Sequence, residues 1–322
     1  MRILVTGGLG FIGAALVKGL LQKGHAVRVL DDASRGTQRR LADVWASIDF
    51  MAGDVRDPAA VSAALKGMDE VHHLAFVNGT QFFYSAPELV LDVGVRGMLN
   101  VIDGCRAQGV GRLILASSSE VYHEPLQFPT DETAPLTVPD PLNPRFSYSG
   151  GKIASELLAL NFGRRDFERV LIFRPHNIYG PDMGWEHVVP QLALRLMRAT
   201  KDLNPIPFSI QGSGRESRTF CHVDDLVAGV LALRERGEHL GIYNIGTTEE
   251  ITIADLAHRM ADWFGRNIVL QPGEAPQGAP SRRCPDIRKL AALGYSPAVT
   301  LAQGLPETLG WYADHAHLAP SS

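Results

Sequence analysis

Short, continuously apolar runs alternate with amphipathic stretches along the first half of the chain. The apolar runs predict six β-strands, at residues 2–6, 26–30, 48–52, 70–74, 112–116 and 170–174. Between them, apolar residues recur at helical spacing over 14–23, 59–66, 87–107 and 149–162. Strands that alternate with helices pair in parallel, and strands apolar throughout are covered by helices on both faces. The pattern therefore predicts an α/β fold with a doubly wound parallel sheet, which binds ligands at the carboxyl ends of its strands.

The pattern changes after residue 174, where prolines interrupt the chain repeatedly. This half is predicted to be a looser, loop-rich lobe that holds the substrate. A helical pattern over 223–234 and an apolar run over 241–245 indicate that the chain returns to the sheet before it ends in the second lobe. We therefore expect a sheet domain of residues 1–174 joined by 217–245, and a smaller C-terminal lobe of residues 175–216 and 246–322.

Composition and charge exclude several classes of protein. The chain has 322 residues, 45% of them hydrophobic, and 31 Lys and Arg against 35 Asp and Glu, so its net charge is −4. No basic run is longer than two residues, which argues against nucleic acid or an anionic membrane as a partner. No apolar run approaches the ~20 residues of a membrane span, and we expect a cytoplasmic protein. The three cysteines form no C-x-x-C motif, and no metal site is expected.

A glycine-rich turn, T-G-G-L-G-F-I-G at residues 6–13, joins the first predicted strand to the first predicted helix. Gly7 permits the tight turn, Gly10 lets backbone approach a pyrophosphate, and Gly13 allows close packing of the helix, whose N-terminus attracts the anion. Asp31 ends the second strand about 20 residues later, where a carboxylate binds ribose hydroxyls and repels a 2′-phosphate. Together they predict a Rossmann-type site for NAD.

Tyr148 and Lys152 lie four residues apart at the start of a predicted helix, so they share one face. A nearby ammonium, together with a nicotinamide cation, favours the phenolate form of a tyrosine, which can then accept a hydroxyl proton. A solvated helical pair is the alternative. The position favours catalysis, because the fifth strand ends in Ser117–Glu120 at the edge where nicotinamide would lie. Gly150 and Gly151 weaken the helix, and close approach of cofactor or substrate would explain them.

In this order, the glycine-rich turn, Asp31, Ser118 and the Tyr148/Lys152 pair resemble the extended short-chain dehydrogenases, specifically the NAD-dependent nucleotide-sugar epimerase/dehydratase family. Later segments are similar to motifs of the same family, and the resemblance covers nearly the whole chain. These segments are R-P-H-N-I-Y-G-P at 174–181, R-T-F-C-H-V-D-D at 218–225, and R-C-P-D-I at 283–287 followed by L-G-Y at 293–295.

The resemblance implies roles for individual residues. Ser118 and Tyr148 would bind the reacting sugar hydroxyl, with Ser119 and Glu120 as further candidate catalytic residues. Lys152 would hold the nicotinamide ribose and lower the pKa of the tyrosine. Asn177, Arg218 and Arg283 would bind the nucleotide diphosphate, although either arginine could instead form a surface ion pair. The remaining candidates are the cofactor contacts Gly7, Gly10, Phe11, Ile12, Gly13, Asp31, Asp54, Val55, Leu74 and Ala75 and the substrate contacts Thr80 and Val188.

Some residues have more than one possible role, and others differ from the residue that is usual in the family. Asp54 could contact the adenine or cap the next helix, and His222 and the acids after it are expected to cap a helix without a catalytic role. Gly151 stands where the family often has Ser, and Gly94 where Asn is frequent. The segment 78–84 is an unusual loop on the sugar side. These departures concern the substrate and leave the NAD prediction unchanged.

All reactions that the resemblance implies begin alike: Tyr148 removes the proton of the carbon-4 hydroxyl while NAD accepts the hydride. Epimerisation at carbon 4 is the favoured expectation, because it needs no further acid or base. A UDP-glucuronate-type decarboxylase is an alternative, since such enzymes also carry Ser-Glu, as at Ser119-Glu120, and an arginine that matches Arg283. A nucleotide-sugar 4,6-dehydratase is another, although many of those present Asp-Glu where this chain has Ser-Glu.

Outside enzymes, the chain could be a non-catalytic NAD-sensing protein, but the intact Tyr148/Lys152 pair argues against that. The predicted helices 87–107 and 149–162 correspond to those through which members of the family pair, so the resemblance implies a homodimer. The expected partner is a nucleotide-diphosphate sugar.

Overall fold

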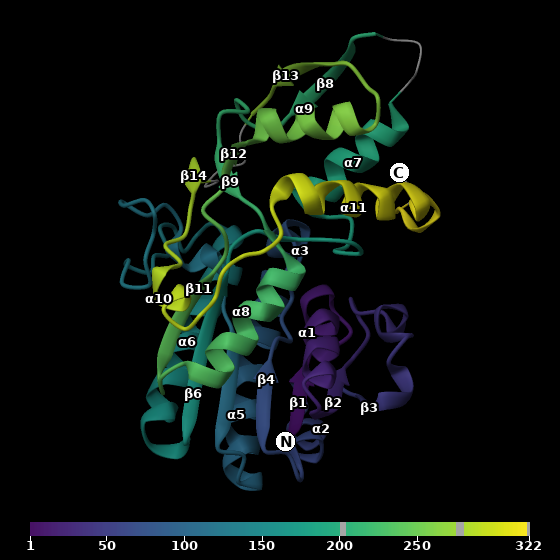
Figure 1. Cartoon of the computed structure of the whole chain (residues 1–322). Coiled ribbons are helices and arrows are strands. Elements are labelled where there is room, and N and C mark those ends of the chain that lie inside the picture. The colour runs from purple at the N-terminus through teal and green to yellow at the C-terminus, as the bar shows by residue number, and fades with distance from the viewer. Residues whose placement is uncertain (200–203, 275–279, 321–322) are drawn as a thin grey trace.

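A seven-stranded parallel sheet forms the lower body of the computed structural model, which describes residues 1–199, 204–274 and 280–320 (Figure 1). All its neighbouring strands are parallel, which confirms the predicted doubly wound sheet. The strands, in spatial order, are β11 (Gly241–Ile245), β6 (Arg169–Pro175), β5 (Arg112–Ala116), β4 (Glu70–His73), β1 (Arg2–Thr6), β2 (Ala26–Asp31) and β3 (Ile48–Ala52). Since β11 pairs with β6, residues far along the chain return to the edge of the sheet.

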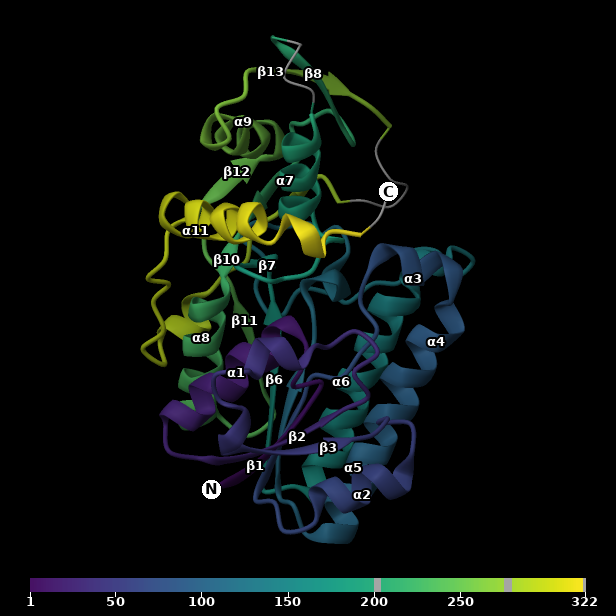
Figure 2. The ribbon, with the colours of Figure 1, turned by 90° about the vertical axis from the view of Figure 1, so that its right-hand side faces the viewer.

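Helices cover both faces of this sheet (Figure 2). Side chains alternate between the faces, so Ile3 and Val5 of β1 are buried in one apolar core and Leu4 in the other. Burial of one such side chain contributes roughly 1.5–3 kcal/mol. One face carries α1 (Phe11–Gln22) and α8 (Val223–Arg236), and the other carries α2 (Pro58–Leu65), α5 (Gly97–Gln108) and α6 (Ser147–Asp166).

The helix predicted over 87–107 is interrupted. It consists of α4 (Pro87–Leu91), a π-helical turn (Asp92–Arg96) and α5. The turn contains Gly94, which is buried. Periodicity cannot reveal such a turn, because one inserted residue changes the spacing of apolar positions very little.

The second lobe is better ordered than its prolines suggested. A separate apolar core lies among α7 (Val188–Arg198), α9 (Ile253–Trp263) and α11 (Leu301–Asp314). Pro190 is tolerated in the first turn of α7, where the backbone N–H has no intrahelical partner to lose. Strand β8 (Ile206–Ile210) pairs in parallel with β13 (Ile268–Pro272) at the top of the lobe (Figure 1).

Short elements connect the two cores. Strand β9 (Ser217–Thr219) lies between β12 (Glu250–Thr252) and β14 (Arg282–Arg283), and β7 (Ile178–Tyr179) pairs with β10 (Cys221–His222). The remaining α-helices of the described chain are α3 (Thr80–Ser85) and α10 (Arg288–Ala291). No helix in this part of the chain is long and apolar enough to cross a bilayer.

His222 caps α8, as expected, whereas the Asp225 side chain binds the backbone of another segment and does not cap the helix. The His222 ring accepts a hydrogen bond from the backbone N–H of Asp224 at 3.3 Å, and Asp225 accepts from the N–H of Ala298 at 2.7 Å. These residues therefore join α8 to the segment before α11.

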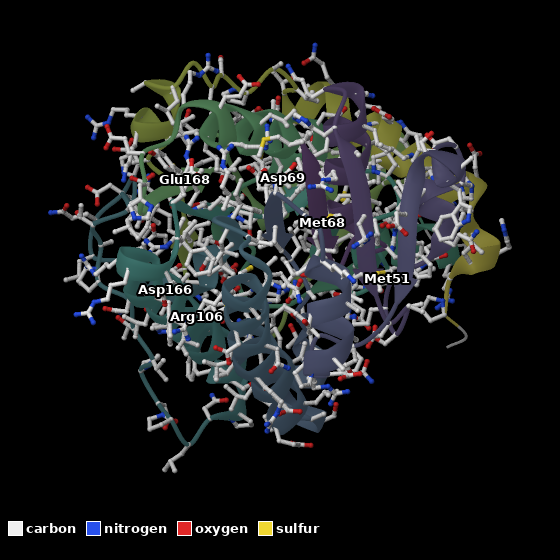
Figure 3. All side chains as sticks on the ribbon, turned by 90° about the horizontal axis from the view of Figure 1, so that it is seen from below. Met51, Met68, Asp69, Arg106, Asp166 and Glu168 are labelled. Atoms are coloured by element: carbon white, nitrogen blue, oxygen red, sulfur yellow. The ribbon has the colours of Figure 1, made fainter. Side chains whose placement is uncertain are left out.

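Charged side chains are buried at the opposite end of the sheet from the strands' carboxyl ends. The Glu70 carboxylate, 1% exposed, accepts from Arg234 Nε at 2.5 Å and lies 2.7 Å from His72 Nε2. Burial alone would raise the pKa of Glu70, but His72 and Arg234 outweigh it and lower that pKa to about 2. On the surface of this end, Arg106 and Asp166 form an ion pair of 3.2 Å between α5 and α6 (Figure 3).

Glu70 should contribute to stability in a pH-dependent way. Its folded pKa of about 2 lies below the ordinary 4.5, so its contribution is complete above pH 4.5 and is lost as the pH falls towards 2. Glu70→Gln should lower the free energy of unfolding at neutral pH by about 3 kcal/mol and flatten its fall in acid. Urea unfolding at several pH values measures both effects. Glu168→Gln is the control, because Glu168 is exposed at the same end (Figure 3); an equal loss in both variants would contradict the assignment.

Candidate active site

A cavity of about 460 Å³ opens at the carboxyl ends of the strands, where a doubly wound sheet binds its ligand. Its walls come from the turn between β1 and α1, from the ends of β2 to β6, and from the loop before α7. The cavity therefore lies between the sheet and the second lobe.

The glycine-rich turn forms one wall because only glycine fits there. Gly7 has φ +73°, and a Cβ on it would lie 2.8 Å from the Ala75 nitrogen. A Cβ on Gly13 would lie 2.1 Å from the Gly7 carbonyl oxygen. Within the described chain, no side chain caps α1 and its first turn holds no acidic residue. Its amide groups thus face the cavity as donors for an anion, which fits a pyrophosphate.

Asp31 both lines the cavity and holds the turn. Its carboxylate accepts hydrogen bonds from the backbone N–H of Leu9 at 2.9 Å and of Ala33 at 2.8 Å. Burial raises the pKa of Asp31, and these two bonds oppose that rise. The oxygens so fixed suit ribose hydroxyls as partners.

Asp54 also lines the cavity, where Arg56 donates to it at 2.6 Å. Asp57, and not Asp54, caps α2 by accepting from the N–H of Ala59 at 2.9 Å.

Lys152 is buried against the end of β5. Its ammonium donates to the Ala116 carbonyl oxygen at 2.7 Å. Burial lowers the pKa of Lys152 to about 7, although Glu156, one turn further along α6, opposes the shift. The lysine therefore titrates near neutral pH in the chain alone.

The pKa of Tyr148 does not follow the expectation. Burial raises it to about 12, despite a hydrogen bond with Ser118 that lowers it. Lys152 lies 5.8 Å from the centre of the Tyr148 ring and donates to backbone instead of the phenol. Lys152 is not among the groups that shift the pKa of Tyr148, so of the two contributions named from the sequence only a nicotinamide cation is left to favour the phenolate.

Ser118 and Glu120 lie beside Tyr148 at the end of β5. The Ser118 hydroxyl accepts from the N–H of Glu120 at 3.1 Å and begins a short turn, Ser119–Tyr122. The Glu120 carboxylate accepts from Arg283 Nη1 at 2.6 Å. Burial opposes its ionisation, but Arg283, Arg145 and Arg218 lower the pKa of Glu120 to about 2. Glu120 is thus an anion at neutral pH, held by a cation from the second lobe.

A buried ion pair lies next to the ends of β5 and β6, beneath the residues that line the cavity. Arg174 Nη2 donates to Glu156 Oε2 at 2.6 Å, and both side chains are about 2% exposed. The Ser117 hydroxyl also donates to Glu156, and Arg174 donates to the Tyr122 hydroxyl at 2.7 Å. The ends of β5 and β6 are therefore fixed relative to α6.

Most of the predicted site residues line this one cavity. Arg218 and Val188 do not: the Arg218 guanidinium donates to the carbonyl oxygens of Ser217 at 2.7 Å and Pro280 at 2.5 Å, and Val188 begins α7 and packs on the core of the second lobe. The predicted residues that line the cavity are Gly7, Gly10, Phe11, Ile12, Gly13, Asp31, Asp54, Val55, Leu74, Ala75, Thr80, Ser118, Ser119, Glu120, Tyr148, Lys152, Asn177 and Arg283.

Several cavity residues escaped the sequence analysis. Phe76 follows Leu74 and Ala75 at the end of β4, so the rule that strand ends carry ligands could have found it. Arg145 lies three residues before Tyr148, a spacing that places it one helical turn away. Nothing in the sequence pairs Arg35 with Glu186, whose ion pair of 2.9 Å joins two loops of the cavity wall.

The same two loops meet at a second point. Asp182 forms ion pairs with Arg39 at 2.9 Å and Arg40 at 3.3 Å. These contacts and the Arg35–Glu186 pair link the loop after β2 to the loop before α7.

The chain is similar in sequence to a known family of proteins. Residues 3–246 match the NAD dependent epimerase/dehydratase family. UDP-glucuronic acid decarboxylase 2 of Arabidopsis thaliana is 32% identical over 311 residues, which are 95% of this chain and 67% of that protein.

Two solved structures show the same fold. UDP-glucose 4-epimerase of Thermotoga maritima, solved with UDP-glucose, has a TM-score of 0.87 at 26% identity, with 98% of this chain and 100% of that one covered. DesIV, a dTDP-glucose 4,6-dehydratase of Streptomyces venezuelae solved with NAD, has a TM-score of 0.87 at 30% identity, with 98% of each chain covered.

Asp31 should be needed for binding of NAD. Asp31→Asn removes the charge and one of the two backbone hydrogen bonds, so the affinity for NAD should fall about 10- to 100-fold. Isothermal titration of the purified protein with NAD measures this. Asp49→Asn, at an exposed carboxylate on β3, is the control; equal affinities of the Asp31 variant and the wild type would refute the assignment.

Proposed function

Because the chain belongs to the NAD dependent epimerase/dehydratase family, we propose that it oxidises a nucleotide-diphosphate hexuronate at carbon 4 and releases its carboxyl group as carbon dioxide. The cofactor is NAD. The observation that carries the proposal is the Glu120–Arg283 ion pair beside Ser118 and Tyr148 in a single cavity. The similarity to UDP-glucuronic acid decarboxylases over 95% of the chain supports it.

The first half of the reaction removes a proton and a hydride from the sugar. A bound NAD would supply the hydride acceptor and donor at carbon 4. Tyr148 takes the proton of the carbon-4 hydroxyl and gives it back to the same oxygen when the hydride returns, and Ser118 hydrogen-bonds that oxygen. Lys152 holds the nicotinamide ribose. The turn of Gly7, Gly10 and Gly13 and the carboxylate of Asp31 hold the rest of the dinucleotide.

The second half follows from the chemistry of a β-keto acid. With carbon 4 oxidised, the bond between carbons 5 and 6 breaks, its electron pair moves to the carbonyl oxygen, and carbon dioxide leaves. Carbon 5 then takes a proton from water. Arg283, held in place by Glu120, stabilises the negative charge on the oxygen. This step needs no separate acid, so Ser119 in place of an aspartate is no obstacle.

The charges at this end of the cavity favour a sugar that carries a carboxylate. In the described part of the chain, Arg145 and Arg283 line this end of the cavity as cations beside the carboxylate of Glu120. Among the described residues, the Arg145 guanidinium has no hydrogen-bond or ion-pair partner, although its backbone N–H is bonded to Asn143 at 3.0 Å. A hexuronate carboxylate would supply a bidentate partner for it.

Epimerisation at carbon 4 is the second candidate, and it is the one the sequence analysis put first. The structural similarity to UDP-glucose 4-epimerase favours it. It would require the keto sugar to turn over in the cavity, so that hydride returns to its other face. The relatives in sequence favour the decarboxylase alternative instead.

We also propose a homodimer. Leu91 of α4, Leu99 of α5 and Leu157 of α6 are exposed, with Leu157 56% exposed, on the helices predicted to pair. The cytoplasmic location and the division of the chain into domains likewise remain predictions.

A panel of nucleotide sugars separates these reactions. Incubated with NAD and UDP-, GDP-, ADP- or CDP-sugars that include UDP-glucuronate, the protein should convert a hexuronate to a pentose with loss of carbon dioxide, seen by mass spectrometry. Loss of water or formation of an isomer would instead identify a dehydratase or an epimerase. Tyr148→Phe should abolish turnover and leave NAD bound. Retained turnover in that variant would remove Tyr148 as the base.

Arg145 should select the carboxylate. Arg145→Gln should weaken binding of UDP-glucuronate, measured by titration in the presence of NAD, about 10- to 100-fold. Binding of UDP-glucose should change far less. Arg164→Gln, at an exposed arginine of α6, is the matched control. An equal loss of affinity for UDP-glucuronate and UDP-glucose would show that Arg145 does not bind the carboxyl group.

A further inference from the structure

Two buried glycines face one aromatic ring. A Cβ on Gly94, in the π-helical turn, would lie 2.3 Å from the tip of Phe76, and a Cβ on Gly151, in α6, would lie 3.1 Å from the same atom. By contrast, a Cβ on the neighbouring Gly150 would meet nothing closer than 3.6 Å. Two separate elements thus lack side chains at the points where the Phe76 ring needs space, and this contact accounts for Gly151 in the early part of α6.

The ring is directed at the lysine of the candidate active site. Lys152 Nζ lies 3.9 Å from the centre of the Phe76 ring, and the Phe76 and Tyr148 rings meet edge to face at 5.2 Å. On its other side, the ammonium donates to the Ala116 carbonyl oxygen at 2.7 Å. Lys152 is therefore held between a carbonyl oxygen and the negative face of an aromatic ring, at a side-chain position that is 3% exposed.

We infer that Phe76 is a positioning residue for Lys152: its ring, given room by Gly94 and Gly151, keeps the ammonium charged and directed along the cavity wall. The inference rests on the proposed function only for the role of Lys152 towards NAD. Through that role, Phe76 acts on the cofactor without being a catalytic residue itself.

The other titratable groups around Lys152 leave its charged and neutral forms close in free energy at neutral pH. Glu156, on the same helix, favours the ammonium, whereas burial disfavours it, and the pKa of Lys152 is about 7. His73 of β4 is uncharged at neutral pH, because burial and then Lys152 lower its pKa to about 3. Tyr148, one turn earlier, is neutral in the chain alone. Because this pKa lies close to neutral pH, a cation–π contribution from Phe76 would change the fraction of Lys152 that is charged.

The simpler view is that Phe76 only fills space, since it packs against an apolar cluster of Val77, Phe83, Val90 and Tyr148. The two views differ in which property of the Phe76 ring is essential, its electrostatics or its shape. If Phe76 acts through cation–π attraction, the negative charge on its face is essential; if it only packs, its shape suffices. Fluorination weakens the face and nearly keeps the shape.

The test measures the pKa of Lys152 directly in the full-length chain, without added nucleotide and again with saturating NAD. The sequence contains six lysines, so the carbon-13 signals of labelled lysine side chains can be titrated one by one, with Lys152→Met to assign the signal. Phe76 is replaced by 4-fluoro-, 3,5-difluoro- and 3,4,5-trifluorophenylalanine and, separately, by Leu. The pKa of Lys152 should fall stepwise with fluorination, by about 0.5–1 unit for the last member and for Phe76→Leu.

Phe83 provides the matched control, because its ring stacks on Tyr148 at 5.0 Å without lying over Lys152. Fluorination there should leave the pKa of Lys152 unchanged. An unchanged pKa across the Phe76 series, or an equal shift in the Phe83 series, would overturn the inference. If Phe76→Leu fails to fold, the fluorinated series decides the question. The measurement needs no sugar, so it stands even if no nucleotide sugar is converted.

A second experiment tests the space that the glycines provide. Gly94→Ala should lower the melting temperature in the wild type and do so much less in a Phe76→Ala background, where the ring is absent. Gly150→Ala should cost little, because its Cβ has room. If Gly94→Ala proves as harmless as Gly150→Ala, the glycines are not there for the ring, and the argument from their placement fails.

Discussion

A buried ammonium is the constraint around which the candidate active site is organised. In the proposed function Lys152 acts on a ribose as an ammonium, yet only 3% of it is exposed and its nearest polar partner is a neutral carbonyl oxygen. An unpaired buried cation is unstable unless the surroundings compensate for lost water. Here the compensation is distributed: a carbonyl at the end of β5, the face of Phe76, and the more distant charge of Glu156. The same burial raises the pKa of Tyr148, so the phenolate that the proposed mechanism needs depends on the positive charge that a bound dinucleotide would bring.

The substrate end of the cavity is assembled from parts of the chain that are far apart. Glu120 comes from the end of β5 and Arg283 from β14 in the second lobe, and their ion pair crosses the boundary between the two cores. Arg145 approaches from the turn before α6. Because Glu120 faces both Arg283 and Arg145, the described residues at this end of the cavity leave positive charge unpaired. In the proposed function that charge, more than the fold, would distinguish a sugar acid from a neutral sugar, since the fold is shared by enzymes of different reactions.

The sequence could predict those features of the site that depend on residues close together in the chain. The turn around Gly7 and Gly13, the carboxylate of Asp31 and the Tyr148/Lys152 pair each depend on residues a few positions apart, so they could be read from the sequence together with the strands of the sheet. What could not be read depends on contacts between distant segments. Arg218 belongs to a family motif, but backbone carbonyls of its own strand and of the loop before β14 bind its guanidinium. The pKa of Tyr148 depends on burial, which has no local signature, and Gly94 gave no hint of Phe76.

The ion pairs that join the loop after β2 to the loop before α7 bear on the fate of the dinucleotide. Arg35, Arg39 and Arg40 hold Glu186 and Asp182 across the wall of the cavity, so two segments beside the proposed dinucleotide site are tied to each other. In a reaction that returns its hydride, the dinucleotide ends each turnover in its original oxidation state. The dinucleotide then does not need to be exchanged between cycles, so these ion pairs can stay formed. NAD would behave as a long-lived prosthetic group while the sugars enter and leave.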